Sequence, residues 1–265
     1  MSFVPVIPFQ GQAGWAFLQR TRDAQQTAFE AQPRIRRNIA EFEQKIASVK
    51  SAQDLVSDRN LLEVALGAFG LDGDINNRFL IEKVLSADTG DQTSLVNRFA
   101  DKRYLALSRA FGFGEPGAIR TGDAGFADRI VEAYRTRQFE IAAGEVDPDM
   151  RLALGFNRDL SEIAARQTLS NDSKWFTVMA SPPLRSVLES ALGLPSSFGA
   201  LDLDQQLGEF KSRSRQRFGT DDIAALSAPD TAAAIVDRFL LLAQIDSIST
   251  SGYSGASVAL ALLQS

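Results

Sequence analysis

The sequence has no cysteine and no histidine among its 265 residues. Without cysteine the chain has no disulfide, no thiolate metal ligand and no cysteine nucleophile. Without histidine it lacks the most common general base, the most common metal ligand and the usual pH switch. These absences exclude serine-histidine-aspartate hydrolysis, zinc catalysis and histidine phosphorelay. We therefore expect no enzyme, no cofactor and no metal site, although carboxylate, lysine, serine or tyrosine chemistry stays formally open.

Long apolar runs and an excess of positive charge are missing too. No stretch approaches the roughly 20 apolar residues that span a bilayer, so we expect no membrane-spanning segment. The first nine residues carry no positive side chain and are interrupted by Pro5 and Pro8, which argues against a Sec signal peptide. The net charge of −5 opposes nonspecific attraction to nucleic acid or anionic lipid. The partners that we expect are therefore proteins.

The residues that are present predict helices. Apolar residues make up 45% and charged residues 23%, which is typical of a chain that folds. The clearest amphipathic pattern repeats at i, i+4, i+7 and i+11: Ile35, Ile39, Phe42 and Ile46. Ser57 is the expected N-cap of the following helix, and Pro182 is expected to open a later helix that ends at Gly193. We predict an all-α fold, an elongated bundle-like array of many helices with short connections punctuated by glycine and proline, and no significant β-sheet.

Three segments are expected along the chain. Residues 1–12 form an extended apolar arm, because proline forbids a helix there; residues 13–246 form the helical domain, with a possible sub-division near 112–125; residues 247–265 form a tail rich in serine and glycine. Both ends carry apolar side chains that we take as candidate partner-binding residues: Phe3, Val4, Val6, Ile7, Phe9, Val258, Leu260, Leu262 and Leu263. The alternative is that both ends pack on the core of this chain.

Two short motifs have simpler interpretations than ligand binding. Gly112, Gly114 and Gly117 have the spacing of a dinucleotide-binding loop, but a helix rather than a strand precedes them, which favours a helix C-cap and a turn. A basic run could grip phosphates, yet its alternation with polar residues favours the solvated face of a helix. The run consists of Lys211, Arg213, Arg215 and Arg217.

Several long strings resemble an uncharacterised alphaproteobacterial family of unknown function whose genes commonly lie among flagellar genes. The most specific are DLVSDRNLLEVALGAFGLDGDINNRFLIEKVL from Asp54 and KWFTVMASPPLRSVLESALGLPSSFGALDLDQQL from Lys174. The resemblance covers roughly residues 39–244 and carries no catalytic residues. It implies a helical protein of flagellar assembly or function.

Two functions follow as hypotheses. The first is a non-enzymatic structural or assembly protein of the flagellum that binds flagellar proteins or itself, either exported without a Sec signal or held at the cytoplasmic base. The second is a cytoplasmic regulator or chaperone of a flagellar protein. An enzyme ranks third.

Overall fold

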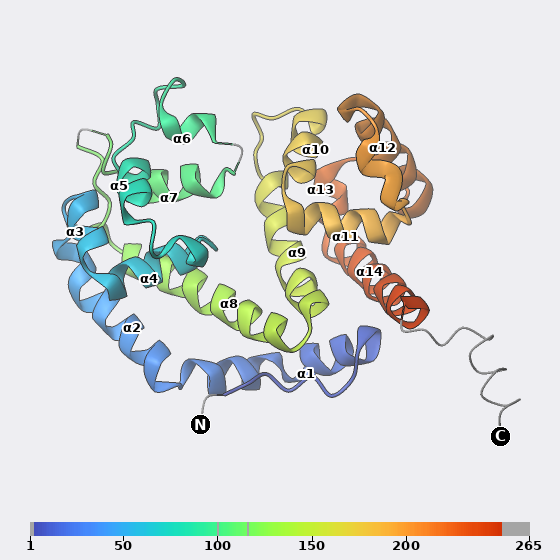
Figure 1. Cartoon of the computed structure of the whole chain (residues 1–265), viewed down its shortest axis with the longest axis horizontal. Coiled ribbons are helices and arrows are strands. Elements are labelled where there is room, and N and C mark those ends of the chain that lie inside the picture. The colour runs from blue at the N-terminus through green and yellow to red at the C-terminus, as the bar shows by residue number, and fades with distance from the viewer. Residues whose placement is uncertain (1–2, 100, 116, 251–265) are drawn as a thin grey trace, which may run out of the picture. The chain divides into compact units, whose positions relative to one another are not determined.

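The computed structural model describes residues 3–99, 101–115 and 117–250. Within these ranges all regular secondary structure is helical and no strand occurs, which confirms the all-α prediction (Figure 1). The α-helices are α1 (Gly11–Glu30), α2 (Pro33–Lys45), α3 (Ala52–Ser57), α4 (Arg59–Ala68), α5 (Arg78–Leu85), α6 (Leu95–Arg98), α7 (Arg103–Phe111), α8 (Phe126–Val146), α9 (Pro148–Ala164), α10 (Asn171–Met179), α11 (Pro182–Leu192), α12 (Leu203–Phe218), α13 (Ile223–Leu226) and α14 (Pro229–Thr250). Three short 3-10 helices are η1 (Ile46–Ser48), η2 (Asp72–Asp74) and η3 (Ser196–Ala200).

The helix ends follow local rules that the sequence carries. Pro182 opens α11, where its missing N–H is not needed, and Gly193 ends it in the left-handed conformation at φ +64°. Gly112 ends α7 in the same way at φ +70°, as the C-cap interpretation predicted. The expected cap at Ser57 is wrong by one residue, because the Asp58 carboxylate accepts the free N–H groups at the start of α4.

The described chain forms two compact units rather than a single helical domain. The first holds residues 3–5 and 22–142, and the second holds residues 6–21 and 143–250. The division therefore falls inside α1 and α8, and the expected sub-division near 112–125 is not where the chain divides. That stretch belongs to the first unit because the Phe111 and Phe126 rings pack edge to face and Thr121 Oγ1 donates to Val49 O at 2.7 Å.

Each unit has its own apolar core. In the first, α2 packs on α4, α3 packs on α4 and α5, and α5 packs on α7. Tyr134 of α8 is fully buried there, with its ring against Gly67 of α4. In the second unit, α11 packs on α14 and α9, and α10 packs on α11 and α12. The Trp175 ring stacks on the ring of Phe210, and the Phe198 ring packs edge to face on it.

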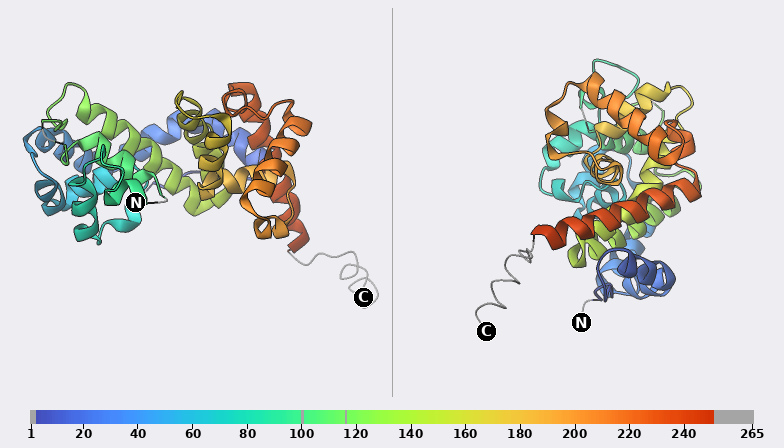
Figure 2. Two further views of the ribbon diagram at one scale, coloured as in Figure 1. Left: turned by 90° about the horizontal axis from the view of Figure 1, so that it is seen from above. Right: turned by 90° about the vertical axis from the view of Figure 1, so that its right-hand side faces the viewer.

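The two ends of the helical region differ slightly from the expected boundaries. The chain becomes helical at Gly11, so the arm is shorter than residues 1–12. Helix α14 continues to Thr250, past the expected end at 246, because no glycine or proline interrupts it (Figure 2). Residues 251–265 lie outside the described part of the chain.

Candidate functional site

The amino-terminal arm, residues 3–10, contacts the protein with one side and exposes the other. Phe3 packs edge to face on Phe29 with ring centroids 6.5 Å apart, and its N–H donates to Gln32 Oε1. Pro5 is buried, whereas the neighbouring Val4 and Val6 are exposed. This alternation is that of a chain whose successive side chains point to opposite sides. The arm thus exposes Val4 and Val6 to solvent, while Phe3 and Pro5 on its other side pack on the protein.

The start of α1 lies against α14 within the second unit. Gln12 Nε2 donates to Asp237 O at 3.0 Å. A Cβ placed on Gly11 would meet the side chain of Gln244, and the φ of +60° at Gly11 is a conformation that other residues rarely adopt. One turn later, a Cβ on Gly14 would meet the Phe9 carbonyl oxygen at 1.9 Å. These close approaches hold the start of α1 beside α14 and the end of the arm against the first turn of α1.

Exposed apolar side chains occur on the arm and on α14, the two segments that flank this junction. Asp237, Leu241 and Gln244 follow i, i+4 and i+7, so Leu241 lies on the helix face that α1 touches. Leu241 and Ile245 are 40% and 48% exposed, and Val6 and Phe9 of the arm are 54% and 59% exposed. We call this set the arm–α14 surface: Val6, Phe9, Leu241 and Ile245. Exposed apolar groups that gather on one face mark interaction sites more often than isolated ones do.

The predicted binding residues divide into three groups. Val4, Val6 and Phe9 are exposed, and Val4 belongs to the first unit. Phe3 and Ile7 are half-buried against the protein itself, which agrees with the alternative that the arm packs on its own chain. The remaining predicted residues lie outside the described part of the chain: Val258, Leu260, Leu262 and Leu263.

Sequence reasoning missed the contribution of α14. Leu241 and Ile245 belong to the run FLLLAQI, which is apolar almost all round. Such a run predicts a buried helix and does not show which side is left uncovered. Leu240 is fully buried while the adjacent Leu241 is exposed, and only the packing of α14 on α9 and α11 decides between them.

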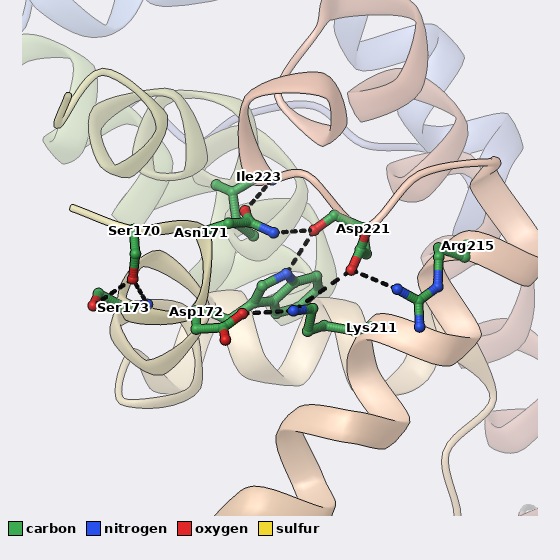
Figure 3. Close-up of polar contacts among 9 residues, drawn as sticks. Ser170, Asn171, Asp172, Ser173, Lys211, Arg215, Asp221 and Ile223 are labelled. Atoms are coloured by element: carbon green, nitrogen blue, oxygen red, sulfur yellow. Dashed lines mark hydrogen bonds and ion pairs between the residues drawn. The ribbon is translucent and has the colours of Figure 1, made fainter. Parts of the chain in front are cut away.

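A polar cluster in the second unit joins α10, α12 and the segment before α13 (Figure 3). Asp221 O accepts from Trp175 Nε1 at 2.7 Å and from Asn171 Nδ2 at 2.9 Å. The Asn171 side-chain oxygen also accepts from Ile223 N at 3.0 Å, so Asn171 binds the backbone of both Asp221 and Ile223. The Asp221 carboxylate lies 2.9 Å from Arg215 Nη1. This cluster ties three elements together around a buried tryptophan.

The cluster also explains the basic run. Lys211 Nζ lies 2.5 Å from Asp172 Oδ1, and its hydrogen bond to that carboxylate raises the pKa of the lysine. Arg213 pairs with Glu209 at 3.3 Å on the same helix. With Arg215 paired to Asp221, three of the four basic side chains have an acidic partner within the chain. These pairings agree with a solvated helix face.

A shallow hollow of ≈ 400 Å³ lies in the first unit between α1, α2 and α8. Its lining mixes charges of both signs, Glu30 and Glu43 with Arg36 and Arg135. Glu30 and Arg135 pair at 3.7 Å. The hollow is open rather than enclosed, so the water exclusion that strengthens catalytic charges is missing there.

The structure describes residues 3–99, 101–115 and 117–250. Among them, no three histidine, cysteine, aspartate or glutamate side chains come together in a group that could hold a metal ion. In the same ranges, no helix is both long and apolar enough to cross a membrane.

The described residues form an all-helical protein of two units, with exposed apolar side chains on the arm and on α14 of the second unit. The chain belongs to the family described as a protein of unknown function (DUF1217), whose model matches residues 68–232. The expected membership of an uncharacterised family is thus confirmed.

The crystal structure of protein AGR_C_984 from Agrobacterium tumefaciens, a structural-genomics target, is similar to this chain with a TM-score of 0.72. The two sequences are 22% identical, and the similarity covers 92% of this chain and 99% of that one. At this identity the likeness shows the fold. No curated protein matches the chain.

Proposed function

We propose that this protein is a non-enzymatic structural or assembly component of the bacterial flagellum that binds a flagellar protein through the arm–α14 surface. The observation that carries the binding role is the exposure of Val6 and Phe9 on the arm and of Leu241 and Ile245 on α14, within one unit whose α1 and α14 are in contact. The flagellar setting comes from the family resemblance of the sequence, whose genes commonly lie among flagellar genes. Gene neighbourhood is an association, so the experiment must identify the partner.

The physical argument is that these side chains gain from burial without a change in the fold. Each exposed apolar side chain buried by a partner contributes about 25 cal/mol per Å² of area removed from water. The arm is already held by Gly11 and Gly14, so less conformational entropy is lost on binding than for a free peptide. A few side chains usually carry most of the binding energy of an interface, and Phe9 is the largest of the four exposed here.

The test expresses a tagged copy of this protein in flagellated cells that encode a member of the family, and identifies the proteins that co-purify with it. The double variant Val6→Ser, Phe9→Ser should reduce recovery of a flagellar protein at least tenfold. Leu203→Ser is the matched control, because Leu203 is 61% exposed in the same unit but lies at the start of α12. If the unchanged protein, the double variant and Leu203→Ser recover equal amounts of the flagellar protein, the arm–α14 surface is not the binding site.

The location of the tagged chain separates the two hypotheses. Recovery of the chain outside the cell, dependent on the flagellar export apparatus, supports the structural role. A chain that stays inside with its flagellar partner supports the regulator or chaperone instead.

A further inference from the structure

Helix α5 of the first unit carries the most exposed large apolar side chain among the described residues, the ring of Phe79, which is 74% exposed. On the opposite side of the helix Ile81, Val84 and Leu85 are fully buried, and α5 packs on α3, α6 and α7. Phe79 and Lys83 are four residues apart, so they share the outward face. Lys83 Nζ lies over the Phe79 ring, 5.4 Å from its centroid. The buried side fixes the helix, and the ring and the ammonium group lie together on its outer side.

The charge around this ring is positive although the whole chain is acidic. Residues 75–111, which hold α5, α6 and α7, carry six basic and four acidic side chains, whereas the net charge of the chain is −5. These three helices pack on one another in the first unit (Figure 1). Arg78 and Lys83 are both exposed and form no ion pair among the described residues. A partner that approaches α5 therefore meets uncompensated positive charge.

The four carboxylates of this region do not neutralise that charge. Asp88 and Asp91 each accept the backbone N–H two residues further on, at 2.8 Å. Asp101 pairs with Arg103 at 2.6 Å. Glu82, the remaining one, is half-buried on the flank of α5. An acidic partner would thus supply the carboxylate that the two cations of α5 lack within the described part of the chain.

We propose that the outward face of α5 is a second protein-binding surface, whose partner is a segment that places an apolar side chain against Phe79 and a carboxylate against Lys83. We call Phe79, Lys83 and the adjacent Arg78 the α5 surface. Burial of the ring provides the affinity, because an exposed ion pair alone contributes little. The cations select the partner, since they attract carboxylates and repel other cations. The α5 surface belongs to the first unit and is separate from the arm–α14 surface, which belongs to the second.

Two synthetic peptides test the α5 surface on the purified full-length chain. The acidic peptide is an amphipathic helix with leucines four residues apart and glutamates beside them, and the basic peptide has lysine in place of every glutamate. In an isotope-labelled chain, the acidic peptide should shift the amide resonances of residues 78–86, and the basic peptide should not. Phe79→Ala should weaken binding of the acidic peptide at least tenfold, as expected for the central aromatic anchor of an interface. Leu203→Ser, which replaces another exposed apolar side chain, should leave the binding unchanged.

Charge reversal distinguishes a selective surface from an exposed ring that binds any apolar peptide. The double variant Arg78→Glu, Lys83→Glu keeps Phe79 but carries carboxylates beside it, so it should bind the basic peptide in preference to the acidic one. Salt at about 0.5 M should weaken both preferences by screening the charges. Thermal melts of the variants should match that of the unchanged chain, because the three side chains are exposed.

Three groups of results would overturn the proposal. No shift from either peptide, equal shifts from both, or binding that survives Phe79→Ala would show that the α5 surface does not select an acidic apolar segment. A dimer of the purified chain that Phe79→Ala dissociates would make a second copy the occupant. Binding to phosphatidylglycerol vesicles that Phe79→Ala abolishes would make a lipid surface the occupant. Because these measurements need no flagellar partner, their failure leaves the cell experiment with Val6→Ser, Phe9→Ser to decide the proposed function separately.

Discussion

At the scale of single residues, the contrast between two helical glycines tests the packing of the first unit. A Cβ on Gly67 would lie 2.7 Å from Tyr134 Cδ2, in a buried contact. Overpacking costs about 1–3 kcal/mol, more than the ~0.5–1 kcal/mol that alanine contributes in a helix. Gly67→Ala should therefore lower the free energy of unfolding. Gly208→Ala should raise it slightly, because nothing lies within 4 Å of that position. Urea denaturation of both variants measures the two changes in the free energy of unfolding. Changes of the same sign would refute the contact between Gly67 and Tyr134.

The Asp58 cap predicts a pH dependence. Partial burial alone would raise its pKa, but hydrogen bonds from Lys45 and from two backbone N–H groups outweigh burial and lower the pKa. A lowered folded pKa means that the charge stabilises the fold above the unfolded value of about 3.9, and that this contribution is lost as the pH falls through the folded pKa.

Asp58→Asn keeps an acceptor without the charge, so it should be less stable than the wild type by about 0.3–1 kcal/mol at pH 7. The difference should be smaller at pH 3, because the contribution of the charge is lost as the pH falls through the lowered pKa of Asp58. Asp58→Ala also removes the acceptor, and its loss of about 1 kcal/mol should persist at pH 3. Thermal melts at the two pH values compare the three chains. A deficit of the asparagine variant that does not change with pH would contradict the role of the charge.

At the scale of elements, α11 shows how much the sequence predicts. Its start at Pro182 and its end at Gly193 were predicted from the pattern, and the structure confirms them. Its buried stripe consists of Leu184, Val187, Leu188 and Leu192. Leu188→Ala should cost about 2–5 kcal/mol, since the side chain is fully buried. Ser186→Ala on the exposed side of the same helix should change stability by less than about 0.5 kcal/mol. Similar denaturation midpoints for the two variants would mean that α11 does not pack as described.

The segment before α13 shows where pattern reasoning stops. Its position depends on Asn171 and Trp175, which bind the backbone of Asp221 across a separation of 50 and 46 residues. Hydrogen bonds of this kind have no periodic signature. Ser170 caps α10, whereas the neighbouring Asn171 holds the distant segment. Local propensity cannot distinguish these two uses of a polar side chain.

At the scale of the whole molecule, the class of fold was predictable and the division into units was not. Helical periodicity and glycine or proline stops recur throughout the chain, so the all-α class follows from local signals. The division depends instead on long-range contacts, such as Thr121 with Val49, that hold the stretch near 112–125 in the first unit. The arm was recognisable from its prolines, but the exposed side of α14 depends on which neighbours cover that helix.

The central claim is that the arm–α14 surface binds a flagellar protein, and site-specific photo-crosslinking in the cell tests it most directly. A photo-reactive phenylalanine analogue at position 9 replaces an exposed ring with one of similar shape, and the same analogue at position 216 on α12 is the control. Illumination of flagellated cells should give a covalent adduct between position 9 and a flagellar protein, with little adduct from position 216. Adducts of equal yield from both positions, or an adduct from position 216 alone, would contradict the account.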